Sequence, residues 1–160
     1  MKIYGSTTSP YVRRLRLLLA EQQYEFKTVN IFGEDRDWIR KVNPTMKIPM
    51  FEDLTAPDVT MILDSQLAYQ YLQEKLALKP LTMSQQNELA LINSCNDALV
   101  NTMILTRSGI DTSQDKLYFN IQRERCETSF IYFNQQVEKG EYQEWNYVAM
   151  SLLVLFEWVQ

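Results

Sequence analysis

Hydrophobic and polar positions divide this chain into two halves with different patterns. In the first half, short apolar runs alternate with segments whose apolar residues recur at helical spacing. The pattern predicts strands over residues 2–5, 26–31, 50–53 and 59–63, and helices over 10–23, 34–42 and 66–74. The predicted order is therefore strand, helix, strand, helix, strand, strand, helix, with the last two strands antiparallel around a turn at 55–58.

The second half contains only helical patterns. Helices are predicted over residues 84–107, 113–139 and about 145–159, with Ser84 as the N-cap of the first, Ser113 as the start of the second, and Gly109 and Gly140 ending these two. The apolar residues expected to face inward are Leu89, Ile92, Leu99 and Met103 in the first helix, and Leu117, Ile121, Phe130, Phe133 and Val137 in the second. The third helix is apolar nearly all the way round, so it requires burial on every side. We therefore divide the chain into an α/β domain over 1–75, a linker over 76–83 and an all-helical domain over 84–160.

Three junctions in the first half carry groups that can bind a ligand. Ser9, which precedes Pro10, is predicted to cap the first helix, and Asp64-Ser65 to cap the helix that follows the hairpin. Between them, Pro49 stands directly ahead of a strand, where a cis Ile48–Pro49 bond is one of two possibilities. In a sheet of this order such junctions gather at one end, which is where open α/β sheets bind ligands. The alternative is that they are ordinary caps and a strand start.

The tip of the first helix is suited to an anion. A helix start presents unpaired backbone N–H groups and about half a positive charge. At Ser9 this would favour an anionic group such as a thiolate.

Charge and composition narrow the possible partners. The net charge is −4, but residues 1–80 carry 11 Lys/Arg and 10 Asp/Glu, whereas residues 81–160 carry 5 and 10. A small anionic ligand is therefore favoured in the first half. Arg13, Arg14 and Arg16 are confined to one helix, so the sequence has no basic stripe long enough to bind along a nucleic acid.

Several kinds of chemistry are excluded by composition. The chain has no histidine, which removes Ser-His-Asp and Cys-His catalysis and histidine-ligated metals. With four glycines and no glycine-rich loop, a dinucleotide fingerprint is also excluded. Cys95 and Cys126 lie far apart in predicted helices, so we expect free thiols in a reducing cytoplasm, with a disulfide as the alternative. No signal-peptide pattern is present, and the apolar stretch 148–156 is about half a membrane span, which indicates a cytosolic protein.

Three local matches, in this order of elements, resemble the glutathione S-transferase family. Residues 4–14, Tyr-Gly-Ser-Thr-Thr-Ser-Pro-Tyr-Val-Arg-Arg, look like the opening of its bacterial serine-type members. Residues 43–49, Asn-Pro-Thr-Met-Lys-Ile-Pro, are similar to its Asn-Pro-x-x-Lys-Val-Pro segment, whose last proline is cis. Asp64-Ser65 takes the place of its acidic-Ser pair. The resemblance implies a thioredoxin-like βαβαββα N-terminal domain followed by an all-α C-terminal domain.

The resemblance implies that these positions bind glutathione. Ser9 would donate a hydrogen bond to the glutathione sulfur and favour the thiolate over the thiol. Ile48, held by cis Pro49, would pair its backbone with the cysteinyl part. Tyr11 would line the pocket for the second substrate.

The two ends of glutathione would be held by charged and polar groups. Asp64 would bind the γ-glutamyl ammonium group, and Ser65, with the helix amides, the γ-glutamyl carboxylate. Lys47 would bind the glycyl carboxylate. A plain helix cap at Asp64-Ser65 and a solvated charge at Lys47 remain the alternatives.

Two departures from the family pattern lie in the helical half. The family begins its buried sixth helix with a Ser/Thr-x-x-Asp capping box, where residues 143–146 read Gln-Glu-Trp-Asn, a weaker arrangement. The family's final helices are also missing from these 160 residues. We therefore expect the helix over 147–159 to lie against another subunit, stay partly exposed, or move into a site it would not normally fill.

The leading hypothesis is a cytoplasmic, homodimeric glutathione transferase that joins the glutathione thiolate to a small hydrophobic electrophile in detoxification. Glutathione would be the co-substrate, with no separate cofactor and no metal. Residues 9–12 read Ser-Pro-Tyr-Val where related proteins have Cys-x-x-Cys, which disfavours dithiol exchange. A glutathione-dependent peroxidase or reductase and a non-catalytic binding module stay open as alternatives.

Overall fold

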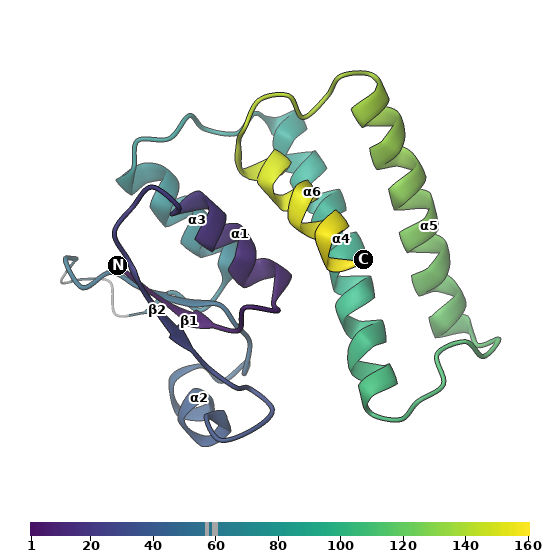
Figure 1. The fold of residues 1–160 in the computed structure, drawn as a ribbon, viewed down its shortest axis with the longest axis horizontal. Coiled ribbons are helices and arrows are strands. Elements are labelled where there is room, and N and C mark those ends of the chain that lie inside the picture. Colours follow the sequence, from purple (N-terminus) through teal and green to yellow (C-terminus); the bar gives the residue numbers. More distant parts are fainter. Residues whose placement is uncertain (57, 59–60) are drawn as a thin grey trace. The chain divides into compact units, whose positions relative to one another are not determined.

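The computed structural model describes residues 1–56, 58 and 61–160, and it forms two compact units, Met1–Pro80 and Leu81–Gln160 (Figure 1). The elements of the first unit are β1 (Lys2–Gly5), α1 (Pro10–Leu18), β2 (Glu25–Thr28), α2 (Arg36–Val42), β3 (Met50–Glu52) and α3 (Ser65–Lys75). Those of the second unit are α4 (Met83–Arg107), α5 (Leu117–Glu138) and α6 (Tyr147–Trp158). An α/β unit is thus followed by an all-helical unit, as predicted.

The sheet of the first unit has the strand order β2-β1-β3. β1 runs parallel to β2 and antiparallel to β3, with Ile3 opposite Phe51 and Tyr4 opposite Met50. Because successive side chains of a strand point to opposite faces, Ile3 and Phe51 share one face and Tyr4 and Met50 the other.

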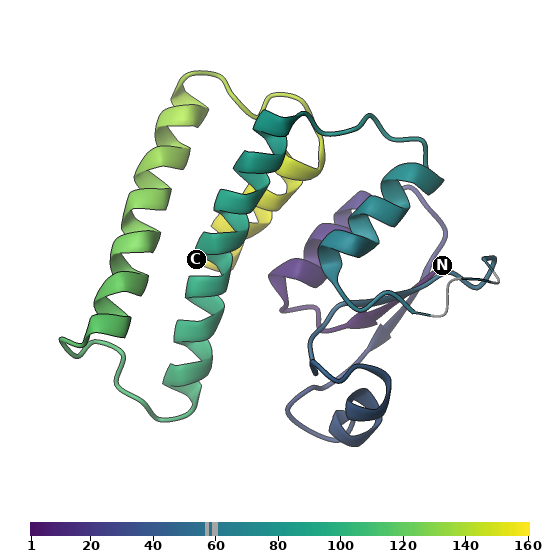
Figure 2. The same cartoon turned by 180° about the vertical axis from the view of Figure 1, so that it is seen from behind.

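The two faces of this sheet are covered by different helices. The Phe51 ring lies 5.8 Å from the ring of Tyr71 on α3, and α3 also contacts α1. On the other face, Tyr4 and Met50 form a cluster with Ile39 and Trp38 of α2. The sheet therefore lies between the α1–α3 pair and α2, as Figure 2 shows from behind.

Gly5 allows α1 to approach the end of β1 closely. A Cβ atom at this position would lie 2.4 Å from Val12 Cγ2 and 3.0 Å from Val12 Cγ1. Val12 is fully buried, so it has no free space into which to move. The missing side chain thus sets the distance between the first strand and the helix that Ser9 caps.

The predicted ends of two elements in this unit, α1 and β2, differ from the structure by three residues or more. α1 ends at Leu18 rather than near 23, because turns over 19–22 bring the chain back so that Glu25 N–H donates to Met1 O (3.0 Å). β2 ends at Thr28 rather than 31, because Asn30 N–H donates to the Asp35 carboxylate (2.8 Å) in a turn toward α2.

The predicted fourth strand, residues 59–63, lies partly outside the described residues, as does position 57 of the predicted turn. In the described part, Ile62 pairs antiparallel with Phe51, and the two exchange backbone hydrogen bonds of 2.8 and 2.9 Å. The antiparallel pairing is therefore confirmed at one position.

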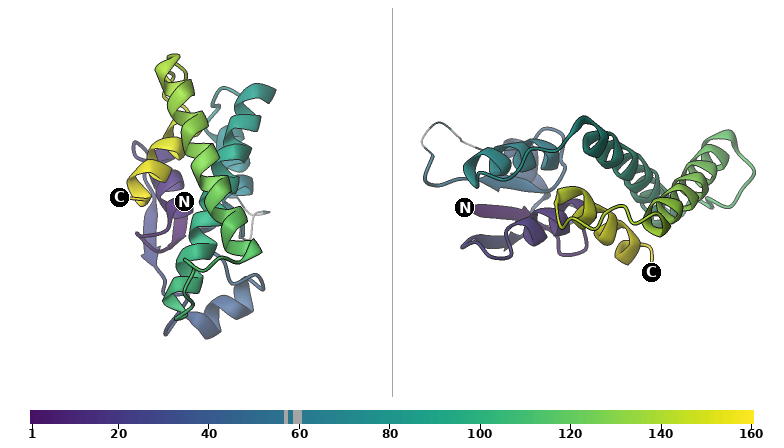
Figure 3. Two further views of the ribbon diagram at one scale, coloured as in Figure 1. Left: turned by 90° about the vertical axis from the view of Figure 1, so that its right-hand side faces the viewer. Right: turned by 90° about the horizontal axis from the view of Figure 1, so that it is seen from above.

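In the second unit, α4 contacts both α5 and α6 (Figure 3). Its N-cap is Thr82, not the predicted Ser84: the Thr82 hydroxyl accepts from Gln85 N–H (3.2 Å), and the Gln85 side chain accepts from Thr82 N–H (3.0 Å). α5 begins at Leu117 rather than 113, because the Asp111 carboxylate accepts both the N–H and the hydroxyl of Ser113 in a turn.

The predicted inward face of α5 is wrong in part. Phe133 is fully buried, but Leu117, Ile121 and Val137 are exposed. Ile121 and Phe130 are nine residues apart, which is about two and a half turns, so they lie on opposite sides of one helix. The stripe that contains the buried residues of α5 instead begins at Gln122 and continues through Phe133.

α6 is largely buried within the chain itself. Eight of its residues, among them Tyr147 and Leu155, have little or no exposed surface, although Leu153 stays exposed. Asn146 caps the helix alone: its side-chain oxygen accepts from Val148 N–H (2.9 Å) and Ala149 N–H (3.1 Å). The weak capping sequence expected at 143–146 thus still ends in an effective N-cap.

Candidate functional site

The register of the sheet brings the three predicted junctions of the first unit to the same end of the strands. β1 ends at Gly5, beside Met50, the first residue of the antiparallel β3, so Pro49 lies next to the end of β1. Ile62 pairs antiparallel with Phe51, which places Asp64 next to Pro49 in turn. Ser9, Pro49 and Asp64 therefore surround one end of the sheet.

Ser9 is the N-cap of α1, as predicted. Its side-chain oxygen accepts a hydrogen bond from Val12 N–H at 3.4 Å, and its own N–H donates to Ser6 O at 3.1 Å. The hydroxyl therefore acts as an acceptor toward the helix, and its hydrogen can be donated to a ligand. Pro10 follows at the first helical position, and no acidic residue occupies the first turn. The half-buried Ser9 thus lies at a positive helix end.

Tyr11 lies in the first turn of α1 and is half-buried. The guanidinium carbon of Arg14 lies 4.9 Å from the centre of the Tyr11 ring, and Arg14 has 1% of its surface exposed. This cation–π contact holds the ring of Tyr11 against its own helix, in the turn that Ser9 caps.

The Ile48–Pro49 peptide bond is cis, the form that the resemblance implies. Among the residues that the structure describes, no backbone hydrogen bond engages the N–H or C=O of Ile48. Each residue carries one backbone donor and one backbone acceptor, so Ile48 can pair with an extended ligand backbone. Lys47, next to it, is exposed.

Asn43 holds the loop before Pro49, a role that sequence reasoning missed. Asn43 is fully buried, and its amide donates to Lys47 O at 2.9 Å. Its side-chain oxygen accepts from the N–H and the hydroxyl of Thr45, at 3.0 and 2.8 Å. One side chain therefore fixes both ends of the turn that leads to Ile48. In the sequence, Asn43 is marked only by its position directly before Pro44, which predicts the end of a helix and not this role.

Asp64 is the N-cap of α3, and Ser65 is its first residue. Asp64 Oδ1 accepts from Gln66 N–H (2.8 Å) and from Leu67 N–H (3.0 Å), whereas Oδ2 takes part in no hydrogen bond among the described residues. Asp64 is exposed, so one carboxylate oxygen faces outward beside a helix N-terminus. The site thus combines a carboxylate with backbone N–H groups, which suits a ligand that carries both an ammonium group and a carboxylate.

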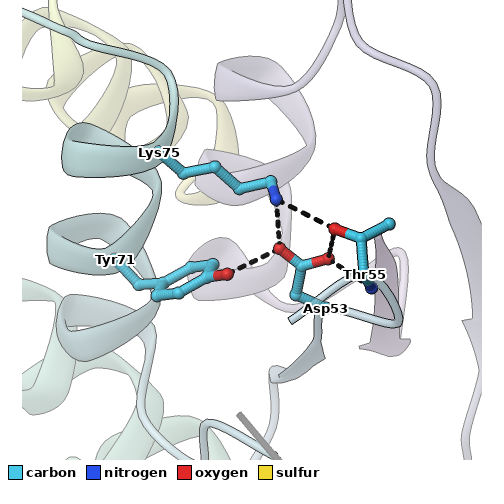
Figure 4. Close-up of polar contacts among 4 residues, drawn as sticks. All are labelled: Asp53, Thr55, Tyr71 and Lys75. Atoms are coloured by element: carbon cyan, nitrogen blue, oxygen red, sulfur yellow. Dashed lines mark hydrogen bonds and ion pairs between the residues drawn. The ribbon is translucent and has the colours of Figure 1, made fainter. Parts of the chain in front are cut away.

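A second carboxylate, Asp53, ties the loop after β3 to α3 (Figure 4). Lys75 Nζ lies 2.5 Å from Asp53 Oδ2, and the Tyr71 hydroxyl donates to the same oxygen at 2.6 Å. The N–H and hydroxyl of Thr55 donate to Oδ1 at 2.9 and 2.7 Å. Burial alone would raise the pKa of the Asp53 carboxyl, but the bonds from Lys75, Tyr71 and Thr55 outweigh it and hold the pKa well below its usual range.

The same contact affects Tyr71 in the opposite direction. Its hydrogen bond to Asp53 and its partial burial raise the pKa of Tyr71 to about 12. The phenol therefore stays protonated and keeps donating over the physiological range. Asp53 and its three partners are a structural anchor at the opposite end of β3 from Pro49, and the sequence did not point to them.

The helical unit has a hollow of its own, with a volume of about 430 Å³, among the start of α4, the end of α5 and the start of α6. Glu88 lines it and accepts hydrogen bonds from the hydroxyls of Tyr132 and Tyr142, the latter at 2.5 Å. The bond to Glu88 raises the pKa of Tyr132 to about 12, and burial followed by the bond to Glu88 raises the pKa of Tyr142. These residues come from distant positions, so no local pattern predicts them.

Within the described residues, no three histidine, cysteine, aspartate or glutamate side chains are grouped so as to hold a metal ion. The same part of the chain contains no helix with the length and apolar character needed to cross a membrane.

Residues 3–80 match the sequence model of the glutathione S-transferase N-terminal domain. Residues 3–80, just under half of the chain, therefore belong to the glutathione S-transferase family as its N-terminal domain. The first unit is thus a thioredoxin-like domain, followed by a helical region.

Solved structures of the family share the fold over almost the whole chain. A glutathione S-transferase from Methylobacillus flagellatus, solved with glutathione bound, is 21% identical with a TM-score of 0.79, covering 99% of this chain and 82% of that one. A glutathione transferase family member from Pseudomonas fluorescens Pf-5, also with bound glutathione, is 16% identical with a TM-score of 0.82, over the same shares. At these identities the likeness shows the fold alone.

One curated relative matches the N-terminal half. The pyrimidodiazepine synthase of Drosophila melanogaster is 28% identical over 82 residues, which is 51% of this chain. The match spans 34% of that protein, so the chain covers about a third of the length of this relative.

Proposed function

We propose that residues 1–75 bind glutathione and lower the pKa of its thiol, so that the thiolate adds to a small hydrophobic electrophile. The observation that carries this proposal is the convergence of Ser9, the backbone of Ile48, and Asp64-Ser65 at one end of the sheet. Membership of the glutathione S-transferase family supports it, as do the related folds that were solved with glutathione bound.

Ser9 is the residue proposed to activate the thiol. Its hydroxyl hydrogen would be donated to the glutathione sulfur, while its oxygen keeps the bond from Val12 N–H. A hydrogen bond to the charged form and the positive helix end both stabilise a thiolate relative to a thiol. Ser9 would therefore act on a bound nucleophile without itself becoming one.

The rest of glutathione would be held by the two neighbouring junctions. The N–H and C=O of Ile48 would pair with the cysteinyl part of the ligand. The outward oxygen of Asp64 would accept from the γ-glutamyl ammonium group, and Ser65 with the first amides of α3 would bind the γ-glutamyl carboxylate. Lys47 would bind the glycyl carboxylate, and Tyr11 would contact the electrophile.

In the proposed reaction, the sulfur of the glutathione thiolate forms a bond to an electrophilic carbon. The product is a thioether, and either a leaving group departs with its electron pair or the adduct takes up a proton. The protein contributes by orienting the tripeptide and by keeping the sulfur ionised near neutral pH.

The test is glutathione binding by isothermal titration calorimetry, together with the pKa of the bound thiol from its ultraviolet thiolate absorbance. Ser9→Ala is expected to raise that pKa by about one to two units, because a hydrogen bond to a charged group is worth about 1.5–3 kcal/mol. Ser6→Ala is the matched control, since the Ser6 side chain contacts the Thr8 hydroxyl in the same exposed loop. The proposal fails if the folded wild type does not bind glutathione, or if Ser9→Ala leaves the thiol pKa unchanged.

Product analysis separates the reaction types. A thioether formed from a general electrophile supports conjugation, whereas oxidised glutathione formed from a peroxide or a mixed disulfide supports the peroxidase or reductase alternative. Binding without turnover would indicate a non-catalytic glutathione-binding module.

The proposal extends to a cytoplasmic homodimer that acts in detoxification, as the family resemblance implies. Sedimentation equilibrium of the purified chain tests the dimer: a mass of twice 18.9 kDa is expected, and a monomer at micromolar concentration would contradict it.

A further inference from the structure

The helical unit brings its two cysteines together across a helix interface. Cys95 lies on α4 and is fully buried, and Cys126 lies on α5 and is half-buried. α4 and α5 run antiparallel, and the Tyr132 hydroxyl of α5 donates to the Glu88 carboxylate of α4. Cys95 lies seven residues after Glu88 and Cys126 six residues before Tyr132, so the two thiols lie at the same level of the helix pair. In agreement with this placement, each thiol shifts the pKa of the other through a hydrogen bond between them. α4 and α5 pack side by side within Leu81–Gln160 (Figure 3), so the contact is internal to that unit.

The surroundings of the two sulfurs make them unequal. The hydrogen bond from Cys95 and the nearby charge of Arg125 lower the pKa of the Cys126 thiol, against the opposing effects of burial and Glu127. The same hydrogen bond and burial raise the pKa of Cys95, although a bond to Ser129 opposes this. Cys126 is therefore the thiol that ionises first, with Cys95 S–H as its donor.

The two thiols also differ in their exposure to solvent. Cys126 lies in the stripe of α5 that contains Gln122 and Phe133, but part of its surface reaches solvent. Cys95 has no exposed surface, so a reagent in solution reaches Cys126 alone. An accessible, more acidic thiol beside a second, shielded thiol is the arrangement of a peroxide-sensitive cysteine and its resolving partner.

We propose that Cys126 is oxidised by hydroperoxides and that Cys95 resolves the product as an internal disulfide. The Cys126 thiolate attacks one peroxide oxygen, the O–O bond breaks, and the alkoxide or hydroxide leaves with a proton from solvent. Cys126 is then a sulfenic acid. Cys95 loses its proton and its sulfur attacks Cys126, expelling hydroxide, which takes up a proton to become water. Two thiols are oxidised to one disulfide, and the hydroperoxide is reduced to an alcohol and water.

The disulfide would join α4 to α5 inside Leu81–Gln160, and both partners lie outside Met1–Pro80. The modification requires no glutathione and no residue of the predicted glutathione site. Loss of glutathione binding would therefore leave this inference intact, and the reverse also holds.

The experiment exposes the reduced, full-length chain to stoichiometric hydrogen peroxide, with and without dimedone, which traps sulfenic acids. Remaining thiols are then alkylated, and intact masses and disulfide-linked peptides are measured. The wild type is expected to lose the mass of two hydrogen atoms, to yield a peptide pair joining Cys95 to Cys126, and to recover both thiols with dithiothreitol. Cys95→Ser should accumulate the dimedone adduct at Cys126. Cys126→Ser should react more than about tenfold more slowly.

Circular dichroism checks that each variant is folded, and Cys95→Ala replaces Cys95→Ser if the buried hydroxyl prevents folding. The inference is overturned if Cys126→Ser consumes peroxide as fast as the wild type. It is equally overturned if the wild type forms only disulfides between chains, or if it accumulates the dimedone adduct as fully as the Cys95 variant.

Discussion

Replacing Asp53 by Asn tests whether the buried carboxylate anchors the loop after β3 to α3. The side chain of Asp53 has no exposed surface, and its two oxygens accept four bonds, from Lys75, Tyr71 and twice from Thr55. An asparagine has the same size but offers one acceptor oxygen and an NH2 group. In either orientation of the amide, its NH2 group faces hydrogen-bond donors, either those of Lys75 and Tyr71 or those of Thr55.

The expected loss is about 3 kcal/mol in the free energy of unfolding. Removing one member of a buried ion pair costs about 3–5 kcal/mol, because the other charge is left uncompensated. Lys75 keeps 31% of its side chain exposed, so water can partly take the place of the carboxylate, which favours the lower end of that range. The free energy of unfolding of a typical domain is about 5–15 kcal/mol, so this loss is large enough to measure easily.

The effect should depend on pH with a defined sign. The native pKa of Asp53 lies well below its ordinary value of 3.8, so the ionised form is favoured by folding. The stabilisation is therefore fully present above about pH 4–5 and is lost as the pH falls through the native pKa. The gap between wild type and Asp53→Asn should narrow between about pH 5 and pH 3.

Urea unfolding followed by far-ultraviolet circular dichroism measures both quantities. Glu52→Gln is the matched control: Glu52 accepts from the Tyr4 hydroxyl at 2.8 Å, and a glutamine oxygen can accept the same bond. That variant should stay within about 0.5 kcal/mol of the wild type. Equal stabilities for the two variants, or a gap that is constant from pH 7 to pH 3, would refute the reasoning.

Three further predictions concern positions that set the fold of each unit. Gly5→Ala should lower the free energy of unfolding by about 1–3 kcal/mol in thermal denaturation, since the new Cβ would lie 2.4 Å from Val12 Cγ2; an unchanged midpoint would contradict the close packing. Asn43→Ala should cost about 2–3 kcal/mol in urea unfolding and weaken glutathione binding in calorimetry, because it removes three hydrogen bonds from the loop before the cis bond. Thr82→Ala should cost about 1 kcal/mol by the loss of the capping box, whereas Ser84→Ala should be neutral, and the reverse order would restore Ser84 as the cap.

Local patterns were enough to predict the caps at Ser9 and Asp64 and the order of the described elements. Ser9 and Asp64 precede helices that their own side chains cap, and each bond spans two or three residues. The alternation of strand and helix in the first half follows from periodicities of two and 3.6 residues, which are properties of short segments. The cis form of the Ile48–Pro49 bond was predicted from the family motif, because a proline by itself permits both the cis and the trans form.

Contacts between distant segments were outside the reach of these patterns. The inward face of α5 was assigned wrongly in part because the helix carries apolar residues on opposite sides, and only packing against α4 and α6 selects the buried side. In the same way, the pairing of Ile62 with Phe51 depends on sheet register, which the composition of a short apolar segment does not determine.

By itself, the sequence determined the type and order of the described elements, the helix caps at Ser9 and Asp64, the exclusion of histidine chemistry and the family motif around Ser9, Pro49 and Asp64. Only the tertiary structure decided that Asp53 meets Lys75, and that Cys95 meets Cys126. The physical reason is that caps and periodicity involve groups within about one helical turn, whereas these pairs form only once register and helix rotation have placed distant residues side by side.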